Sequence, residues 1–406
     1  MKITTSVSSS TLSETEYLSF LINHAIENNF SVAVWRMPGD KRKHLLISRQ
    51  HQLLKRDKPV EELPAGFIFA PFDRQKDSIF LPGDYVFSFS DNELNVAETP
   101  AETASLTWLQ EQLKRPASAL KQKAYARPSV ADHIQRVEKS DQEKDIYLNI
   151  VKSCIEEIEK GTFEKVVPSR TKPVDLPAGF DIVEAFQKLC SSYTNALVSY
   201  VSSPETGSWL GASPEVLVSI EDKTIFKTVA LAGTKPYHEG VNLKTVAWTQ
   251  KEIEEQALVE RYIISCFKKI RLREYDEHGP KTVVAGNLLH LRSDFTVDMK
   301  ATNFPQLGSV MLQLLHPTSA VCGMPLEPAL DFLKKNEDRD REFYAGFLGP
   351  VNFNNMVSLF VNLRCMQLRD DNALLYAGAG VTIDSVPENE WEETEMKLNT
   401  LLNVIS

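Results

Sequence analysis

Cysteine is scarce in this sequence, and its cysteines are widely separated. The 406 residues contain five cysteines, at positions 154, 190, 266, 322 and 365, and no Cys-x-x-Cys motif. An odd number of widely spaced cysteines argues against a disulfide framework and against a structural zinc site. The eight histidines never form a His-Glu-x-x-His motif, which excludes that class of zinc hydrolase. The cysteine pattern predicts a protein of the reducing cytoplasm.

Long hydrophobic runs and an excess of positive charge are also missing. No uncharged apolar run reaches the roughly 18 residues that cross a bilayer, and the N-terminal MKITTSVSSSTLSETEYLSF lacks the apolar core of a secretory signal. The 45 basic and 55 acidic residues give a net charge of −10. This balance argues against nucleic acid or an anionic membrane surface as the main partner. We therefore expect no nucleic-acid partner and no membrane partner.

Hydrophobic patterning predicts antiparallel strands together with separate helices. In DYVFSFS, from Asp84, residues alternate as in a half-buried strand. EVLVSI and KTIFKTVAL flank a tight polar turn, and MVSLFVNLRCMQL and ALLYAGAG flank residues 369–372, so both pairs predict hairpins. Helices are expected over residues 14–29, 132–160, 245–271, 328–336 and 389–405. Hairpins with segregated helices indicate an α+β fold.

Two of these predicted helices carry the same acidic spacing. Glu252 and Glu255 are three residues apart, and so are Glu390 and Glu393, with Lys397 four residues further on. Such spacings fall on one helix face. Paired carboxylates on two helices could share one Mg²⁺, which binds few carboxylates and keeps some of its waters. The alternative is two solvated helix faces with internal salt bridges.

Four single residues each have a chemical and a structural interpretation. Arg364 lies in the apolar stretch 357–366, which we interpret as one strand, and it needs either a ligand carboxylate or a structural glutamate. Lys165 opens the apolar KVVPSR, where burial would favour the neutral amine of a general base, unless the lysine is structural. Glu215 is a buried acid or an edge carboxylate, and His290 lies in an apolar stretch that is typical of core histidines.

Small residues end two of the predicted strands. Gly378-Ala379-Gly380 follows one strand, without the immediate helix that a dinucleotide-binding fingerprint requires. Gly233 and Thr234 end another. At both places glycine could let backbone N–H groups approach a ligand carboxylate, and the alternative is a plain turn.

Nine sequence blocks in one order, over about residues 134–405, resemble the chorismate-utilising enzymes. The blocks are KVVPSR, WLGASPEVL, ALAGTK, KEIEEQALVE, LLHPTSAVCGMP, DREFYAGFLG, NLRCMQL, LYAGAG and ENEWEETEMK. The family includes isochorismate synthases, salicylate synthases, anthranilate synthase large subunits and aminodeoxychorismate synthases. The resemblance implies one α+β body of stacked, mostly antiparallel sheets surrounded by helices. Residues 131–406 would be the chorismate-binding catalytic region, and residues 1–130 a variable part that completes the same fold.

The resemblance also implies a pocket for Mg²⁺ and chorismate, with roles carried over block by block. Four glutamates would form the metal site, the first two as direct ligands and the others through water: Glu255, Glu393, Glu252 and Glu390. The metal would hold the ring carboxylate with the backbone of Gly233 and Thr234, and His290 would lie near the ring. The enolpyruvyl carboxylate would be held by Tyr344, Arg364, the backbone of Gly378–Gly380, and Lys397.

Three positions indicate the branch of the family. Ala232 stands where aminodeoxychorismate synthases place a nucleophilic lysine, and Lys165 resembles the lysine of members that use water. Lys165 would activate water at C2 of chorismate, and Glu215 would protonate the departing C4 hydroxyl. At Ala320, lyase members usually have threonine and isochorismate synthases alanine. We therefore predict an isochorismate synthase, a cytoplasmic isomerase without an amidotransferase subunit; the alternatives are a salicylate synthase and a catalytically dead chorismate-binding protein.

Overall fold

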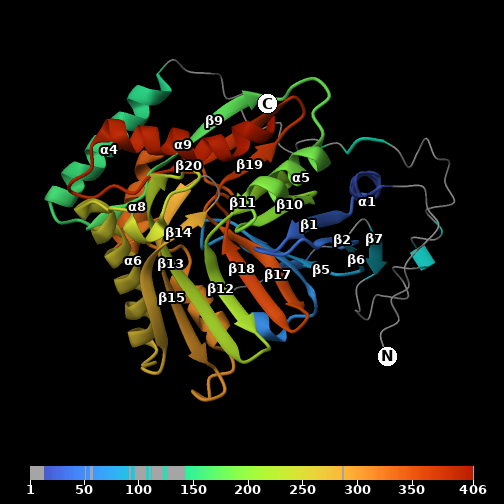
Figure 1. The fold of residues 1–406 in the computed structure, drawn as a ribbon, viewed down its shortest axis with the longest axis horizontal. Helices are drawn as coiled ribbons and strands as arrows, with labels where there is room; N and C mark the ends of the chain where they lie inside the picture. Colours follow the sequence, from blue (N-terminus) through green and yellow to red (C-terminus); the bar gives the residue numbers. More distant parts are fainter. Residues whose placement is uncertain are drawn as a thin grey trace.

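Two nine-stranded antiparallel sheets form the body of the protein in the computed structural model (Figure 1). The structure describes residues 13–50, 52–54, 58–90, 93–96, 107–108, 111, 122–124, 126, 142–285 and 288–405. Within these ranges the α-helices are α1 (Glu14–Glu27), α4 (Glu143–Glu159), α5 (Ile182–Ser192), α6 (Gln250–Lys269), α7 (Leu307–Leu315), α8 (Leu326–Asn336) and α9 (Pro387–Ile405).

The central strands of the first sheet are buried on both faces. Its strand order is β7-β6-β2-β1-β10-β11-β19-β20-β9. The strands are β1 (Ser31–Arg36), β2 (Lys43–Ser48), β6 (Tyr85–Ser90), β7 (Glu93–Val96), β9 (Ser169–Asp175), β10 (Leu197–Ser203), β11 (Gly207–Ser213), β19 (Cys365–Leu368) and β20 (Asn372–Gly378). Successive side chains of a strand point to opposite faces. In β1, Val32 and Val34 accordingly pack in one hydrophobic core, and Ala33 and Trp35 in another.

The second sheet carries the strands that flank the candidate site. Its order is β14-β15-β13-β12-β18-β17-β4-β5-β3. The strands are β3 (Gln52–Leu54), β4 (Gly66–Ala70), β5 (Ser78–Pro82), β12 (Val216–Glu221), β13 (Ile225–Pro236), β14 (Asp276–Ala285), β15 (Leu288–Asp298), β17 (Phe347–Phe353) and β18 (Met356–Val361). A separate pair, β8 (Lys165–Val166) and β16 (Gly323–Met324), joins two short segments antiparallel.

The helices cover the sheets in two groups. Apolar residues of α1, α5 and α9 pack with the first sheet in one core, whereas α4, α6, α7 and α8 contribute to the larger core with strands of both sheets. α6 packs along β13, and α9 packs along β20, so the two helices with the acidic spacing lie on different sheets (Figure 1). Both helices nevertheless begin near each other, because Lys251 in the first turn of α6 pairs with Glu390 in the first turn of α9.

The α+β class, both hairpins and the main helices are confirmed. β12 pairs with β13 and β19 with β20, and α1, α8 and α9 lie where the sequence predicts them. α6 begins later than predicted, and α5 and α7 were not predicted. Of the helix expected over 132–160, the structure describes α4, and residues 132–141 lie outside the described ranges. N-terminal strands contribute to both sheets, but the division at residue 130 also falls outside these ranges.

The prediction of one strand over residues 357–366 is wrong. β18 ends at Val361 in the second sheet, and β19 begins at Cys365 in the first. The chain crosses between the sheets at residues 362–364, where Arg364 adopts a positive φ of 48° that interrupts the extended backbone. The alternating apolar pattern continues through the break because both flanking strands are buried.

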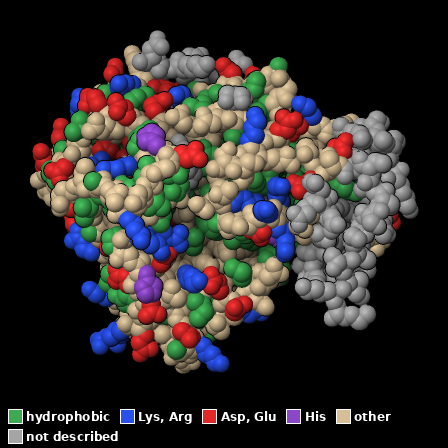
Figure 2. Space-filling model, in the orientation of Figure 1, with side chains coloured by type: hydrophobic (Ala, Val, Ile, Leu, Met, Phe, Trp, Pro, Cys, Tyr) green, Lys and Arg blue, Asp and Glu red, His purple; other side chains and the backbone are tan. Residues whose placement is uncertain are grey.

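The surface carries charges of both signs. In the view of Figure 2, acidic and basic side chains are interspersed across the face, in keeping with the modest net charge of −10. Among the described residues, every helix is too short or too polar to cross a bilayer.

Candidate active site

A cavity that is partly open to solvent collects most of the predicted site residues. Its walls come from β13, β15, β20, α6 and α9 and from six connecting loops. Eleven of the fourteen predicted residues line it: Glu215, Gly233, Thr234, Glu255, His290, Tyr344, Arg364, Gly378, Gly380, Glu393 and Lys397. The other three, Lys165, Glu252 and Glu390, are not part of its lining. The nine blocks of the sequence therefore meet around one space.

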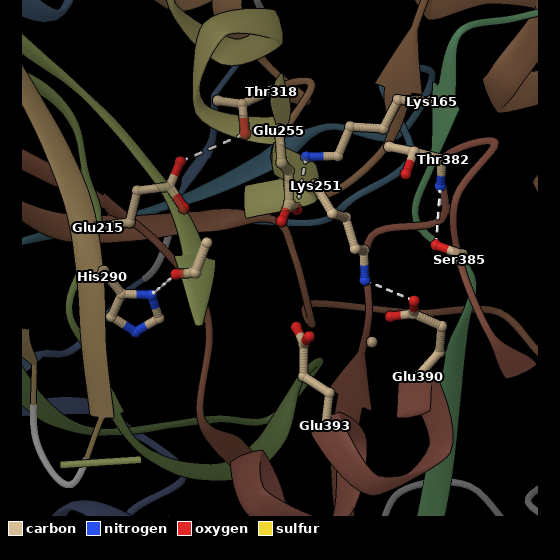
Figure 3. A network of polar contacts seen from close by, with 12 residues as sticks. Lys165, Glu215, Lys251, Glu255, His290, Thr318, Thr382, Ser385, Glu390 and Glu393 are labelled. Carbon is tan, nitrogen blue, oxygen red and sulfur yellow. Dashed lines mark hydrogen bonds and ion pairs between the residues drawn. The ribbon is translucent and has the colours of Figure 1, made fainter. Parts of the chain in front are cut away.

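Lys165 lies buried behind the lining of the cavity and pairs with Glu255, which is part of that lining. Its side chain is 0% exposed, and its Nζ donates a hydrogen bond of 2.8 Å to Oε1 of Glu255 (Figure 3). Burial alone would raise the pKa of Glu255, but the ammonium groups of Lys165, Lys251 and Lys397 lower it below the usual range. Gly380 closes over the pair, because a Cβ there would lie 2.3 Å from Oε1 of Glu255 and 3.0 Å from Cε of Lys165. A larger residue at this position would therefore displace the Glu255 carboxylate from its place against Lys165.

Glu215 is a buried acid at another wall of the same cavity. It is 3% exposed, and burial raises its pKa to about 7 despite the nearby positive charge of Lys165. Thr318 donates a long hydrogen bond of 3.4 Å to Oε1 of Glu215 (Figure 3). Near neutral pH a large fraction of this carboxyl therefore carries a proton, as a general acid requires.

His290 presents an unpaired ring nitrogen at the cavity. Its Nδ1 lies 2.7 Å from the backbone oxygen of Gly233, and its Nε2 has no hydrogen-bond partner. Burial, and to a smaller extent the charge of Arg364, lower the pKa of His290 to about 3. The ring is therefore neutral, with Nδ1–H donating to Gly233, which leaves Nε2 as an acceptor for a ligand hydroxyl. Gly233 has a φ of +66°, which explains a glycine at this turn.

Arg364 is a buried cation without a counterion among the described residues. It is 8% exposed and lines the cavity, and no carboxylate of the described chain lies within ion-pair distance of its guanidinium. Burial lowers its pKa from the ordinary value. Of the two partners that the sequence left open, a structural glutamate is thus not found in the described part of the chain. The positive φ of Arg364 adds backbone strain, which is typical of functional positions.

All four predicted metal ligands pair with lysines: Glu252 lies 3.6 Å from Nζ of Lys235 and also caps a helix. Glu393 accepts from Lys397 at 2.7 Å, and this lysine also donates to the backbone oxygen of Gly378 at 2.7 Å. Glu390 is fully buried and accepts from Lys251 at 2.5 Å. Oε2 of Glu252 accepts two hydrogen bonds from Thr249 as the N-terminal capping box of α6. Glu252 therefore points at its own helix end.

Comparison with known proteins agrees with this geometry. The family model described as "Chorismate binding enzyme" matches residues 67–406. The chain belongs to the chorismate-binding enzyme family. It is 30% identical over 246 residues to isochorismate synthase EntC of Escherichia coli K12, and 29% identical over 275 residues to isochorismate synthase DhbC of Bacillus subtilis 168. These alignments cover 59% and 65% of this chain, and 62% and 68% of the relatives, so the chain spans less than two thirds of EntC.

A solved structure shows the same fold in this family. MenF, the menaquinone-specific isochorismate synthase from Escherichia coli, superposes with a TM-score of 0.72 over 98% of this chain and 92% of MenF. The sequence identity is 18%, so this likeness bears on the fold. The predicted stacked antiparallel sheets surrounded by helices are thereby confirmed.

The carboxylates at the cavity can be compared with the ligands that a hard divalent cation requires. No group of three or more His, Cys, Asp or Glu side chains stands at metal-binding distance in the described ranges. Two carboxylates, Glu255 and Glu393, do line the cavity, and Oε2 of the buried Glu390 has no hydrogen-bond partner. Mg²⁺ needs only one or two protein carboxylates when waters and a substrate anion complete its shell. This donor set therefore fits Mg²⁺.

Two polar residues at this site were not predicted. Thr318 contacts Glu215, and Lys251 contacts Glu390. Both lie inside the sequence blocks that carry the family resemblance. The block positions could have pointed to them, but their partners are distant in the sequence, so spacing along the chain could not reveal either contact.

Proposed function

We propose that this protein is an isochorismate synthase, which converts chorismate to isochorismate with Mg²⁺ as cofactor. One observation carries the proposal: the buried acid Glu215 lines the same cavity as Glu255 and Glu393, and Glu255 holds the buried Lys165, although these residues come from different segments. Water is a poor nucleophile at neutral pH, and a hydroxide is a poor leaving group. The proposed reaction therefore needs both a base and an acid.

The chemistry assigns one proton transfer to each of these residues. In its neutral form, which requires that the ammonium seen paired with Glu255 first lose a proton, the amine of Lys165 takes a proton from water as its oxygen bonds to C2 of chorismate. The two ring double bonds shift, the bond from C4 to its hydroxyl oxygen breaks, and Glu215 supplies the proton with which that hydroxyl leaves as water. One water enters and one leaves, so the reaction is an isomerisation. Returning the proton from Lys165 to Glu215 through solvent restores both groups.

The two carboxylates of chorismate would bind to separate groups. Mg²⁺ held by Glu255 and Glu393 would neutralise the ring carboxylate, beside the backbone of Gly233 and Thr234. The enolpyruvyl carboxylate would pair with Arg364, the cavity cation that lacks a counterion among the described residues. Further donors to this carboxylate would be the hydroxyl of Tyr344, the backbone of Gly378–Gly380 and the ammonium group of Lys397.

Two further findings support this assignment. The relatives EntC and DhbC bear the name isochorismate synthase, and their similarity extends over more than half of this chain. Ala320 lines the cavity, so the residue that suggested the isochorismate branch borders the space where the substrate would lie.

The cellular location is a separate point. The five cysteines are unpaired, which supports a cytoplasmic location.

The product distinguishes this proposal from its alternatives. Purified protein with chorismate and Mg²⁺ is expected to give a mixture of chorismate and isochorismate, because alanine at position 320 provides neither a hydroxyl nor an extra methyl to hold the side chain for elimination. Chromatography identifies the ring product, and lactate dehydrogenase with NADH measures pyruvate. Stoichiometric pyruvate with fluorescent salicylate would instead establish a salicylate synthase. No turnover, with chorismate binding retained, would indicate a catalytically dead protein.

Replacing Arg364 with Met is expected to separate substrate binding from stability. The lost charge-assisted hydrogen bonds should raise the KM for chorismate by roughly 10- to 100-fold. The ligand-free variant should keep or exceed the wild-type melting temperature, because an unpaired buried cation is costly. Arg341→Met is the matched control, since buried Arg341 pairs with Glu337 and its loss should lower the melting temperature. A less stable Arg364→Met protein with unchanged KM would contradict the assignment.

A further inference from the structure

The carboxylates proposed to surround the metal are already neutralised by the protein's own lysines. Three ion pairs of 2.5–2.8 Å account for them: Lys165 with Glu255, Lys251 with Glu390, and Lys397 with Glu393. Figure 3 shows the Lys251 side chain extending into the space between Glu255, Glu390 and Glu393. The cluster therefore holds three negative and three positive charges before any cation enters it.

A divalent cation entering this cluster meets an electrostatic penalty. The three lysines cancel the charge that would attract it, and each ammonium repels it over a few ångströms in surroundings where screening is weak. The penalty is relieved when one of the ammonium groups moves away from the cluster. The exposure and contacts of the three lysines decide which of them can move.

Lys251 is the lysine best placed to leave. The side chain of Lys165 is 0% exposed and its Nζ is held by Glu255 at 2.8 Å, so its ammonium cannot rotate into bulk solvent. Lys397 is 17% exposed and has a second hydrogen bond, to the backbone oxygen of Gly378. The side chain of Lys251 is 23% exposed, is held at the cluster through Glu390, and begins in the first turn of α6. Rotation of its flexible stem would carry the ammonium into solvent.

We propose that Lys251 is an exchangeable internal cation, which neutralises Glu390 in the metal-free protein and moves into solvent when a divalent cation binds. This inference rests on the proposed Mg²⁺ dependence and adds a competitor that belongs to the chain itself. Glu390 is completely buried, and its Oε2 has no partner even with Lys251 in place. Departure of Lys251 therefore removes the 2.5 Å partner of Oε1 and leaves a buried carboxylate that can accept a hydrogen bond from metal-bound water.

Competition by Lys251 can be measured without catalysis. Titration calorimetry of Mg²⁺ into the protein, with no chorismate present, should show roughly tenfold tighter binding by Lys251→Met than by wild type, because the variant lacks the competing charge. The metal-free variant should also unfold at a lower temperature, since Glu390 is then buried and unpaired. Saturating Mg²⁺ should consequently raise the melting temperature of the variant more than that of wild type.

Two further variants make the result specific. Lys251→Arg keeps the positive charge and should bind Mg²⁺ no more tightly than wild type. Lys172→Met removes a lysine that pairs with Glu395 of α9, at 2.9 Å and outside the cluster, and should leave Mg²⁺ affinity unchanged. If Lys251→Met folds poorly, these two variants still test the proposal. Competition by charge requires that Lys251→Arg bind Mg²⁺ as weakly as the wild type does.

The possible outcomes separate this inference from the proposed function. Unchanged or weaker Mg²⁺ binding by Lys251→Met would overturn the exchange and make Lys251 a residue that positions Glu390. Tighter binding by Lys251→Arg would also overturn it, because charge would not be the cause. If wild type bound no Mg²⁺ with or without chorismate, the metal assignment itself would fail. Tighter binding by Lys251→Met alone supports the exchange, whatever product the enzyme makes.

Discussion

Replacing Glu255 with Gln is expected to abolish Mg²⁺-dependent turnover of chorismate, with kcat/KM falling by roughly 10³-fold or more. The amide has nearly the same shape but no charge, so it cannot neutralise a divalent cation. It also removes the partner of Lys165, whose Nζ lies 2.8 Å from the Glu255 carboxylate. The same collapse is expected when EDTA is added to the wild-type protein, and added Mg²⁺ should restore the activity.

The Glu255 experiment has a matched control on the same helix. Glu254 is the adjacent residue, is exposed, and accepts a hydrogen bond from Gln250 at 2.7 Å. Glu254→Gln should therefore turn over chorismate like wild type. Calorimetry should show that Glu255→Gln loses Mg²⁺ affinity, and thermal unfolding should show whether it remains folded. Wild-type turnover in rigorously metal-free buffer would disprove the metal site.

The strands could be predicted because burial leaves a regular pattern in the sequence. The paired runs of β12 with β13 form the predicted hairpin. DYVFSFS forms the strand β6, but the expectation of half burial is wrong, because its four central residues are all buried. The error at residues 357–366 has the same origin. Two buried strands of different sheets follow each other there, so the apolar pattern continues while the chain turns at Arg364. Periodicity reports burial and does not report the sheet to which a strand belongs.

Helix α7 illustrates the opposite case. Its sequence, LGSVMLQLL, is apolar on nearly every side and is buried at six of nine positions. A helix without a polar face has no 3.6-residue alternation by which to recognise it. Helix α9, in contrast, separates the acidic Glu390 and Glu393 from an apolar stripe, and its start was predicted within two residues.

Most site residues were identified through their sequence blocks, but the ion pairs and hydrogen bonds that they form were not. The spacing of Glu252 and Glu255 indicates a common helix face, yet Glu252 caps its helix while Glu255 faces the cavity. Lys251 precedes both and reaches Glu390, 139 residues away in the sequence. Such pairs arise only when α6 and α9 pack with their first turns adjacent. Residue spacing therefore indicated the carboxylates and the pairing of Glu393 with Lys397, but not the lysine partners of Glu255 and Glu390.

Removing the proposed base or acid is expected to lower kcat by roughly 10²-fold or more, the usual effect of losing a positioned proton-transfer group. The two variants are Lys165→Ala and Glu215→Gln, and each should change KM for chorismate much less than kcat. Thr318→Val is a graded control, because it removes only the 3.4 Å hydrogen bond to Glu215 and leaves the carboxyl in place. A wild-type kcat for Lys165→Ala would make Lys165 a structural lysine.

The pH profile of kcat should show whether Glu215 is the proton donor. Burial raises the pKa of Glu215 to about 7, and an acid donates only in its protonated form. The wild-type rate should therefore fall as the pH rises through about 7, because Glu215 then loses the proton that the C4 hydroxyl requires. Glu215→Gln has no such group, so its low residual rate should not show this decline. A decline with the same midpoint in Glu215→Gln would assign the titration to another residue and refute Glu215 as the acid.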